Sequence, residues 1–333
     1  MPRRLSIQQY CQGIQERNRT VLGRAITLVE SRLEADQVLG GKVIQELLPK
    51  TGKAIRIGIT GVPGVGKSSM LDNFGMFLIE QGYSVAVLAI DPSSTLHGGS
   101  ILGDKTRMNK LSTHPSAFIR PSPTDQHLGG VARKTREAML LCEAFGFDII
   151  IVESVGVGQS EVGLADMVDV FLSLMLSGAG DELQGIKKGL LEIADIIAIN
   201  KADGENVHSA KLAEKEYRSA LQYLPQRHKA WKAETICISG MYGLGLSELW
   251  ALIQRHREAL ERSGELQALR KSQERKWFHS LLELRILEKF FAEKSIIEKM
   301  ARQEEEIQNG ELFVGVAVDE LINQFFHSRY SLS

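Results

Sequence analysis

Cysteine is scarce in this chain of 333 residues, and neither sign of charge is in excess. Only Cys11, Cys142 and Cys237 occur, and an odd number of widely separated cysteines argues against a disulfide framework or a zinc-type cysteine cluster. A formal net charge of -1 gives no global electrostatic basis for binding nucleic acid or a membrane surface. We therefore expect no nucleic acid and no membrane among the partners, and a cytoplasmic location.

Long apolar runs are also missing. Residues 1–9 lack the apolar stretch of a signal peptide, and no segment approaches the ~20 apolar residues of a membrane span. The chain is instead 43% hydrophobic and 24% charged, which is typical of a globular protein. This length and composition predict one large α/β domain with appendages.

A phosphate-binding loop is the most informative motif. Residues 61–68 read G-V-P-G-V-G-K-S and lie between a strand-like run and a helix-like run. Glycines let backbone N–H groups face a polyphosphate, and the start of the helix adds the positive end of its dipole. Lys67 is expected to reach the β- and γ-phosphates, and Ser68 to ligate Mg²⁺. The expected nucleotide contacts here are Gly61, Val62, Pro63, Gly64, Val65, Gly66, Lys67, Ser68 and Ser69.

A second motif indicates which base is bound. Asn200, Lys201 and Asp203 form N-K-A-D directly after an apolar run, and N-K-x-D is the guanine-recognition motif of GTPases. The Asp203 carboxylate can accept two hydrogen bonds from guanine N1–H and the amino group, a pair that adenine does not offer. The segment 236–240 resembles the loop whose backbone N–H contacts guanine O6. We therefore expect bound GTP or GDP, with Ser239, Gly240 and Met241 beside the base.

Strand-like and helical patterns alternate through the middle of the chain. The strand-like runs are at 55–60, 84–90, 147–152, 168–176, 195–199 and 235–238, and the helical patterns at 67–81, 130–145, 205–223 and 246–261. This alternation predicts an α/β fold, a P-loop NTPase with a mostly parallel sheet covered by helices on both faces. We expect an N-terminal helical extension at 1–50, the GTPase domain at 51–262 and a C-terminal helical dimerisation region at 263–333.

Three carboxylates are candidates for the Mg²⁺ shell. Asp91 ends a strand-like run, and Glu153 stands where most GTPases carry the Asp of D-x-x-G. Asp104 lies in a glycine-rich stretch between them. The Gly156 N–H is placed to sense the γ-phosphate. Asp91 and Asp104 have an alternative role as caps of turns.

Together these motifs resemble those of a known family. They are G-V-P-G-V-G-K-S at 61–68, D-P-S-S at 91–94, G-G-S-I-L-G-D-K-T-R-M at 98–108, E-S-V-G-V-G-Q-S-E at 153–161, G-D-E-L-Q-G-I-K-K-G at 180–189 and N-K-A-D at 200–203. The set is similar to that of the metallochaperone-type P-loop GTPases, and more narrowly to the methylmalonyl-CoA-mutase-associated GTPases of the MeaB or ArgK type. The resemblance covers nearly the whole chain.

The resemblance implies a function and a set of site residues. It implies a chaperone that uses GTP binding and hydrolysis to assist adenosylcobalamin loading, protection or exchange in a methylmalonyl-CoA mutase-type enzyme. It also implies a homodimer joined by C-terminal helices. The Mg²⁺ ligands it implies are Ser68, Asp91, Asp104 and Glu153.

Hydrolysis is expected to be slow without a partner. Val157 stands where Ras-like GTPases place the Gln that orients water, and an apolar side chain cannot do so. Gln159 and Glu161 either substitute for that Gln or face solvent. The segment 177–189 resembles the third switch of the family, so we expect it to respond to the partner. The candidate catalytic residues are Lys67, Asp104, Glu153 and Lys188.

Two other functions remain open at this point. A nickel metallochaperone GTPase would need clustered Cys and His ligands, whereas the eight histidines here are scattered. A kinase using the same nucleotide site would need a phosphoacceptor pocket. The N-K-A-D motif and the switch-like glycines favour a conformational switch timed by GTP.

The C-terminal region carries two neighbouring apolar stripes at helical spacing. Their members are Trp277, Leu281 and Leu284 on the first stripe and Phe278, Leu282, Ile286 and Phe290 on the second. A helix that is apolar over so wide an arc must be covered from two sides. We expect the GTPase domain to provide one cover and a second subunit the other, which favours a homodimer over an intramolecular cap.

Overall fold

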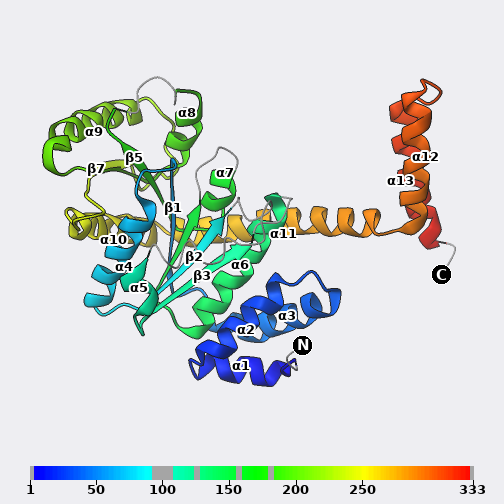
Figure 1. Ribbon diagram of the computed structural model, residues 1–333, viewed down its shortest axis with the longest axis horizontal. Helices are drawn as coiled ribbons and strands as arrows, with labels where there is room; N and C mark the ends of the chain where they lie inside the picture. Colours follow the sequence, from blue (N-terminus) through cyan, green and yellow to red (C-terminus); the bar gives the residue numbers. More distant parts are fainter. Residues whose placement is uncertain (1–3, 92–107, 124–127, 155–159, 179–183, 331–333) are drawn as a thin grey trace. The chain divides into compact units, whose positions relative to one another are not determined.

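The computed structural model describes residues 4–91, 108–123, 128–154, 160–178 and 184–330 (Figure 1). The chain divides into two compact units, Met1–Glu274 and Arg275–Ser333. The N-terminal helices and the sheet belong to the first unit. The domain boundaries expected at residues 50 and 262 stay predictions.

A parallel sheet forms the centre of the first unit. The described strands are β1 (Ile55–Gly61), β2 (Val85–Asp91), β3 (Ala117–Pro123), β4 (Ile149–Ser154), β5 (Val170–Leu176), β6 (Ile196–Asn200) and β7 (Glu234–Cys237). Their order is β3-β2-β4-β1-β5-β6-β7, and every pairing between these strands is parallel. Ile57 of β1 pairs with Ile151 of β4 and with Val170 of β5, so β1 is central. The predicted α/β fold with a parallel sheet is confirmed.

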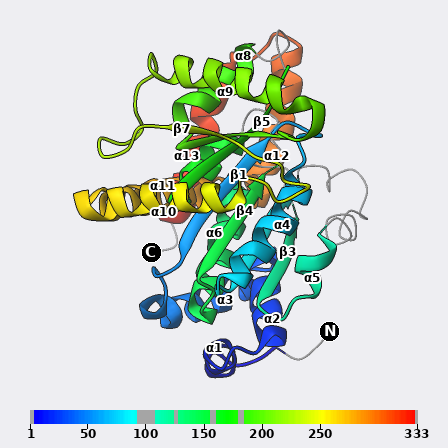
Figure 2. The ribbon, with the colours of Figure 1, turned by 90° about the vertical axis from the view of Figure 1, so that its left-hand side faces the viewer.

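Helices surround this sheet, as the two ribbon views show (Figures 1 and 2). The helices of the first unit are α1 (Ile7–Gln15), α2 (Arg19–Glu30), α3 (Glu34–Leu47), α4 (Lys67–Glu80), α5 (Asn109–Thr113), α6 (Leu128–Phe145), α7 (Ser160–Ala165), α8 (Gln184–Ile193), α9 (Val207–Leu221) and α10 (Leu246–Ser263). Short 3-10 turns lie at η1 (Leu48–Lys50) and η5 (Gly204–Asn206). Helix α11 (Glu265–Phe291) contributes residues to both units.

The sheet has an apolar core on each of its two faces. On β4, Ile150 and Val152 join one core, whereas Ile149 and Ile151 join the other, because successive side chains of a strand point to opposite faces. The first core also draws on α2, α3, α6 and α9, and the second on α4, α5 and α10. Helices therefore cover both faces, which is why the strands read as continuous apolar runs.

The N-terminal extension is helical, as predicted, and the first two of its helices have capped N-termini. The Ser6 side chain accepts from the Gln9 N–H while the Gln9 side chain accepts from the Ser6 N–H, which forms a capping box at the start of α1. The Asn18 side chain caps α2 by accepting from the N–H groups of Thr20 and Val21. Leu22 and Ile26 are fully buried and join the first core. These helices are therefore an integral part of the first unit.

The second unit is helical as well. It contains the end of α11, α12 (Lys294–Gln308) and α13 (Val314–Tyr330). Ile296, Leu321 and Phe325 form its small core, with Phe290 and Met300 partly buried against it. Among the described residues, no helix combines the length and the apolar character that a membrane crossing needs.

Candidate nucleotide-binding site

The predicted phosphate loop joins a central strand to a helix N-terminus. β1 ends at Gly61 and α4 begins at Lys67. A Cβ at Gly61 would lie 2.7 Å from the carbonyl oxygen of Leu174 on β5, so only glycine allows the two strands this approach. Gly66 precedes α4 with a φ of 95°, in the left-handed region that favours glycine. No described side chain caps this helix, so its first N–H groups are available to an anion.

Lys67 is folded against its own loop. The residue is 8% exposed, and its Nζ donates to the carbonyl oxygens of Gly61 at 2.6 Å and Val62 at 3.3 Å. Burial lowers the pKa of Lys67, and the nearby carboxylate of Glu153 opposes that shift. A bound phosphate would give this ammonium a charged acceptor, which is a stronger partner than two carbonyl groups.

Ser68 and Glu153 are the predicted Mg²⁺ ligands whose side chains are described. Ser68 lies partly buried in the first turn of α4. Glu153 is 6% exposed near the end of β4, in register with Ile59 of β1, and it influences the pKa of Lys67. A hydroxyl and a carboxylate are oxygen donors of the kind that Mg²⁺ prefers. The described donor set therefore fits this ion.

Several other predicted residues are not described in full. Asp104 and Gly156 lie outside the described residues, as does the rest of 155–159. Asp91 ends β2, and Lys188 lies in α8, but the side chains of both lie outside the described part of the chain. Their predicted roles at the metal and the phosphates stay predictions.

Glu161 is one of the two side chains weighed as a substitute for the missing water-orienting Gln. It lies in α7 and is 7% exposed. The alternative that it faces open solvent is therefore wrong for this residue.

Asn200 joins the phosphate loop to the guanine-recognition loop. It ends β6 and is 2% exposed. Its Nδ2 donates to the carbonyl oxygen of Val65 at 2.8 Å, and its Oδ1 accepts from the Gly240 N–H at 2.8 Å. One buried amide thus joins three predicted segments, and the ends of β1, β6 and β7 that carry these segments form one site.

The loop around Asp203 is held in a defined conformation. Ser239 donates its hydroxyl to Oδ2 of Asp203. Lys201 adopts a φ of 60°, and its carbonyl oxygen accepts from Nδ2 of Asn206 at 2.7 Å, which stabilises this uncommon backbone. Because each carboxylate oxygen has two lone pairs, Asp203 keeps capacity to accept hydrogen bonds from a base.

Sequence reasoning missed the residues that support these loops. Asn73 of α4 donates from Nδ2 to the carbonyl oxygens of Gly240 at 2.8 Å and Met241 at 3.1 Å. Ser177, at the start of the switch-like segment, donates to Oδ1 of Asn206 at 2.8 Å. No pattern in a single sequence marks either contact, because both join residues that only the fold brings together.

The Asn73 contacts lead to a first prediction. Asn73→Ala should weaken GTP and GDP binding equally, by about 5- to 30-fold, since losing hydrogen bonds worth about 1–2 kcal/mol frees the 240–241 loop. Calorimetric titration with both nucleotides measures this, and Asn323→Ala, at an exposed position of α13, is the control. Unchanged affinity for both nucleotides would show that the loop holds its shape without Asn73.

Comparison with known proteins decides the family. The family model described as "Methylmalonyl Co-A mutase-associated GTPase MeaB" matches residues 22–295. The chain belongs to this family. The resemblance inferred from its motifs is thereby confirmed, and this MeaB-family chain is a P-loop GTPase that binds GTP and GDP and hydrolyses GTP.

Individual relatives agree with the assignment. The MeaB-family chain is 48% identical over 287 residues to "GTPase ArgK" of Escherichia coli strain K12, covering 86% of each chain. It is 44% identical over 323 residues to "Methylmalonic aciduria type A homolog, mitochondrial" of Mus musculus, covering 94% of this chain and 78% of that one. A solved structure named "LAO/AO transport system kinase" is similar with a TM-score of 0.77 at 36% identity, covering 98% of this chain and 99% of that one.

Proposed function

We propose that this MeaB-family GTPase is a chaperone that assists adenosylcobalamin loading, protection or exchange in a methylmalonyl-CoA mutase-type enzyme. The match of 22–295 to a family described as mutase-associated carries the proposal. The name of the mouse relative refers to methylmalonic aciduria, which supports a role connected with methylmalonyl-CoA. GTP is then the signal that times the action on the mutase.

Different residues contact the guanine base and the phosphates. Asp203 accepts from the guanine N1–H and amino group, and Lys201 lies along the base. The backbone of Ser239, Gly240 and Met241 approaches the base from the adjoining loop. The 61–69 loop wraps the phosphates with its N–H groups, and Lys67 exchanges its two carbonyl partners for phosphate oxygens.

A metal ion completes the phosphate site. Ser68 and Glu153, together with Asp91 and Asp104, are the residues that would hold Mg²⁺. When bound, the ion supplies positive charge against the β- and γ-phosphates. The Glu153 carboxylate would then attract two cations, Mg²⁺ and the ammonium of Lys67, because it already acts to raise the pKa of Lys67.

Hydrolysis is proposed to depend on the partner enzyme. Val157 cannot orient water, so the chain alone should turn over slowly. The contact of Ser177 with Asn206, and of Asn206 with the carbonyl of Lys201, supports a route from the 177–189 segment to the guanine loop. Lys188 belongs to this segment. A mutase that binds one conformation of the segment would complete the site of GTP hydrolysis.

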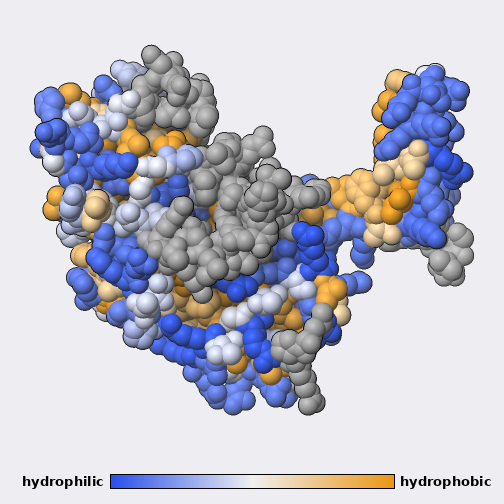
Figure 3. All heavy atoms as spheres, viewed as in Figure 1, coloured by the Kyte–Doolittle hydropathy of each residue, from blue (hydrophilic) through white to orange (hydrophobic). Residues whose placement is uncertain are grey.

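We propose that a second copy of the chain packs against the exposed apolar residues of the second unit. Its exposed apolar residues are Phe278, Leu282, Ile286, Leu287, Phe291, Ile297, Phe313, Val314, Val316, Val318, Ile322 and Phe326. Figure 3 shows apolar surface along the end of α11 and on one side of the α12–α13 pair. Exposed apolar surface of this extent is typical of an interaction site, and a symmetric homodimer would bury the same face twice.

The dimer proposal has a direct test. Changing Phe278 and Ile286 together to Asp should weaken dimerisation by at least about 100-fold, since burying two such side chains contributes at least about 3 kcal/mol. Sedimentation velocity should then show a monomer where the parent chain is a dimer. Tyr223→Asp, at a residue that is 88% exposed outside the second unit, is the control. A double variant that still sediments as a dimer would place the contact elsewhere.

The chaperone role is tested by reconstitution. Cobalamin-free mutase is mixed with adenosylcobalamin, alone or with this chain plus GTP, and acyl-CoA isomerisation is measured after a fixed time. We expect more active mutase with the chain and GTP than with the chain and a non-hydrolysable GTP analogue. The same active fraction in all mixtures would contradict the proposal, and transfer of the γ-phosphate to a molecule other than water would favour a kinase instead.

A further inference from the structure

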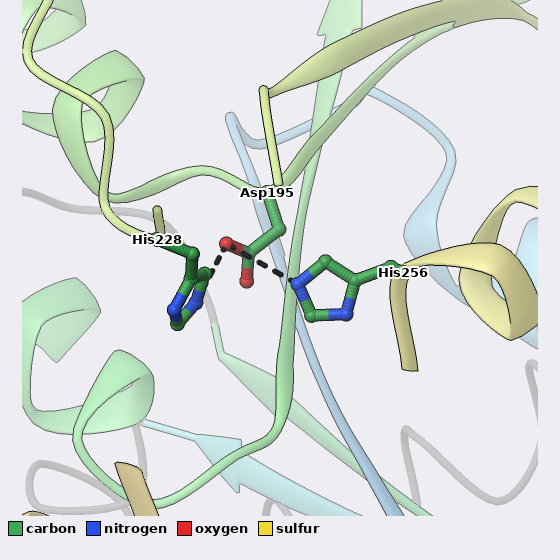
Figure 4. A group of neighbouring side chains, drawn as sticks. All are labelled: Asp195, His228 and His256. Carbon is green, nitrogen blue, oxygen red and sulfur yellow. Dashed lines mark ion pairs between the residues drawn. The ribbon is translucent and has the colours of Figure 1, made fainter. Parts of the chain in front are cut away.

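A buried group of three potential metal ligands lies apart from the nucleotide loops (Figure 4). Asp195 precedes β6, His228 lies between α9 and β7, and His256 lies in α10. Their exposed fractions are 1%, 6% and 1%. Asn200, at the other end of β6, holds the guanine loop, so this group lies at the opposite edge of the sheet.

The two oxygens of Asp195 have different surroundings. Oδ2 accepts from the Phe171 N–H at 2.8 Å and from Nη1 of Arg227 at 2.6 Å. Oδ1 lies 3.3 Å from Nε2 of His228 and 3.7 Å from Nε2 of His256, and Figure 4 shows the carboxylate between the two imidazole rings. These two separations are within the range of an ion pair, but none of the three atoms makes a hydrogen bond among the described residues, and neither does Nδ1 of His256. Buried polar atoms without partners are rare in folded proteins and call for a ligand or a water.

The distances from Oδ1 of Asp195 to the two imidazole nitrogens are close to the ligand spacing of a metal centre. The ligand atoms of all three residues lie within 4.8 Å of one another. Ligands bound tetrahedrally to Zn²⁺ at about 2.0–2.1 Å lie about 3.4 Å from each other. The observed 3.3 and 3.7 Å from Oδ1 to the two nitrogens are within a few tenths of an ångström of that value.

We propose that Asp195, His228 and His256 bind one divalent transition-metal ion, with Zn²⁺ as the best match. Two imidazole nitrogens and one carboxylate oxygen suit Zn²⁺, whereas Mg²⁺ and Ca²⁺ prefer oxygen ligands throughout. The ion supplies the partner that Oδ1 and the two Nε2 atoms lack. Three protein ligands leave a fourth position for water.

The surroundings of the three ligands support them as a metal site. The N–H of Phe171 and the guanidinium of Arg227 orient the Asp195 carboxylate through the oxygen that faces away from the histidines. Nδ1 of His228 lies 3.8 Å from Oε2 of Glu265, which places a second carboxylate behind that imidazole. An adjacent cavity is lined in part by Asp195, Arg227 and Trp231, so it reaches one of the three ligands.

The proposed ion has a structural role. It connects the start of β6, the segment that leads from α9 to β7, and α10, which are distant in the sequence. Because the ligands are almost fully buried, the site offers little room for a substrate. An ion that binds the folded chain and not the unfolded one stabilises the fold in proportion to its affinity.

Metal binding is tested on the untagged full-length chain, with the nucleotide site filled by excess Mg²⁺ and GDP. After removal of other metals by chelation, Co²⁺ is titrated as a spectroscopic substitute for Zn²⁺. We expect one Co²⁺ per chain, with the intense visible bands of a four- or five-coordinate ion, and displacement of these bands by Zn²⁺. Zn²⁺ should also raise the thermal unfolding midpoint of the parent chain.

Three variants locate the site. His228→Gln and His256→Gln should each lose the Co²⁺ bands and the Zn²⁺-dependent rise in unfolding temperature. His208→Gln, at an exposed position of α9, should keep both. If the parent chain shows neither signal, or if the bands survive in both His228→Gln and His256→Gln, the proposal is wrong and the three residues form a metal-free polar network. Should either variant fail to fold, the Co²⁺ stoichiometry and spectrum of the parent chain still decide.

Discussion

Replacing Asp203 by Asn should convert the guanine site into a xanthine site. The carboxylate accepts from guanine N1–H and the amino group, whereas the Asn amide can donate to the oxygen that xanthine carries in place of that amino group. The exchange should shift the ratio of GTP affinity to xanthosine triphosphate affinity by about 100-fold or more, which corresponds to about 3 kcal/mol. Because Ser239 already positions the Asp203 side chain, we expect the Asn to occupy the same place.

Competition binding with both nucleotides measures this exchange. Asp319→Asn, at an exposed position of α13, removes the same charge away from the site and should change neither affinity. If Asp203→Asn keeps the parent preference for GTP, Asp203 does not contact the base.

Replacing Lys67 by Ala should abolish tight nucleotide binding and hydrolysis together. The ammonium is buried within the phosphate loop, where it neutralises charge in the ground state and in the transition state alike. Loss of one preorganised donor at a site of developing charge costs about 10²- to 10³-fold in turnover. GTP and GDP affinity should fall as well, because both nucleotides present the β-phosphate.

Calorimetry with GDP and GTP measures the loss of nucleotide binding. Single-turnover experiments with GTP then measure the loss of hydrolysis. Lys50→Ala removes an exposed Lys of η1 and is the matched control. If Lys67→Ala binds GTP with normal affinity, Lys67 of the parent chain does not contact the phosphates. It would then keep its contacts with Gly61 and Val62 when the nucleotide is bound.

Local motifs made most of the fold and the nucleotide loops predictable. The phosphate loop and N-K-A-D each encode their own chemistry within a few residues, and apolar runs mark buried parallel strands. The strand β3 was missed because Pro121 and Pro123 interrupt its pattern. β3 lies at the edge of the sheet, where a missing backbone N–H is tolerated.

Contacts between distant segments could not be predicted in this way. Asn73 of α4 contacts the 240–241 loop. Nothing in the sequence of α4 distinguishes Asn73 from the other polar residues of that helix. Asp195, His228 and His256 have no short spacing of the kind that marks metal ligands in a sequence. Both groups form only because the sheet order places β6 beside β7 and close to α10.

GTP turnover with and without a saturating adenosylcobalamin-dependent acyl-CoA mutase tests the central claim most directly. The chain alone should hydrolyse GTP slowly, and the mutase should accelerate it at least about tenfold, because a partner that completes a GTPase site acts on this scale or above. A mutase inactivated by heat should have no effect. Turnover that is equally fast with and without native mutase would contradict the account, because GTP hydrolysis would then be independent of the proposed partner.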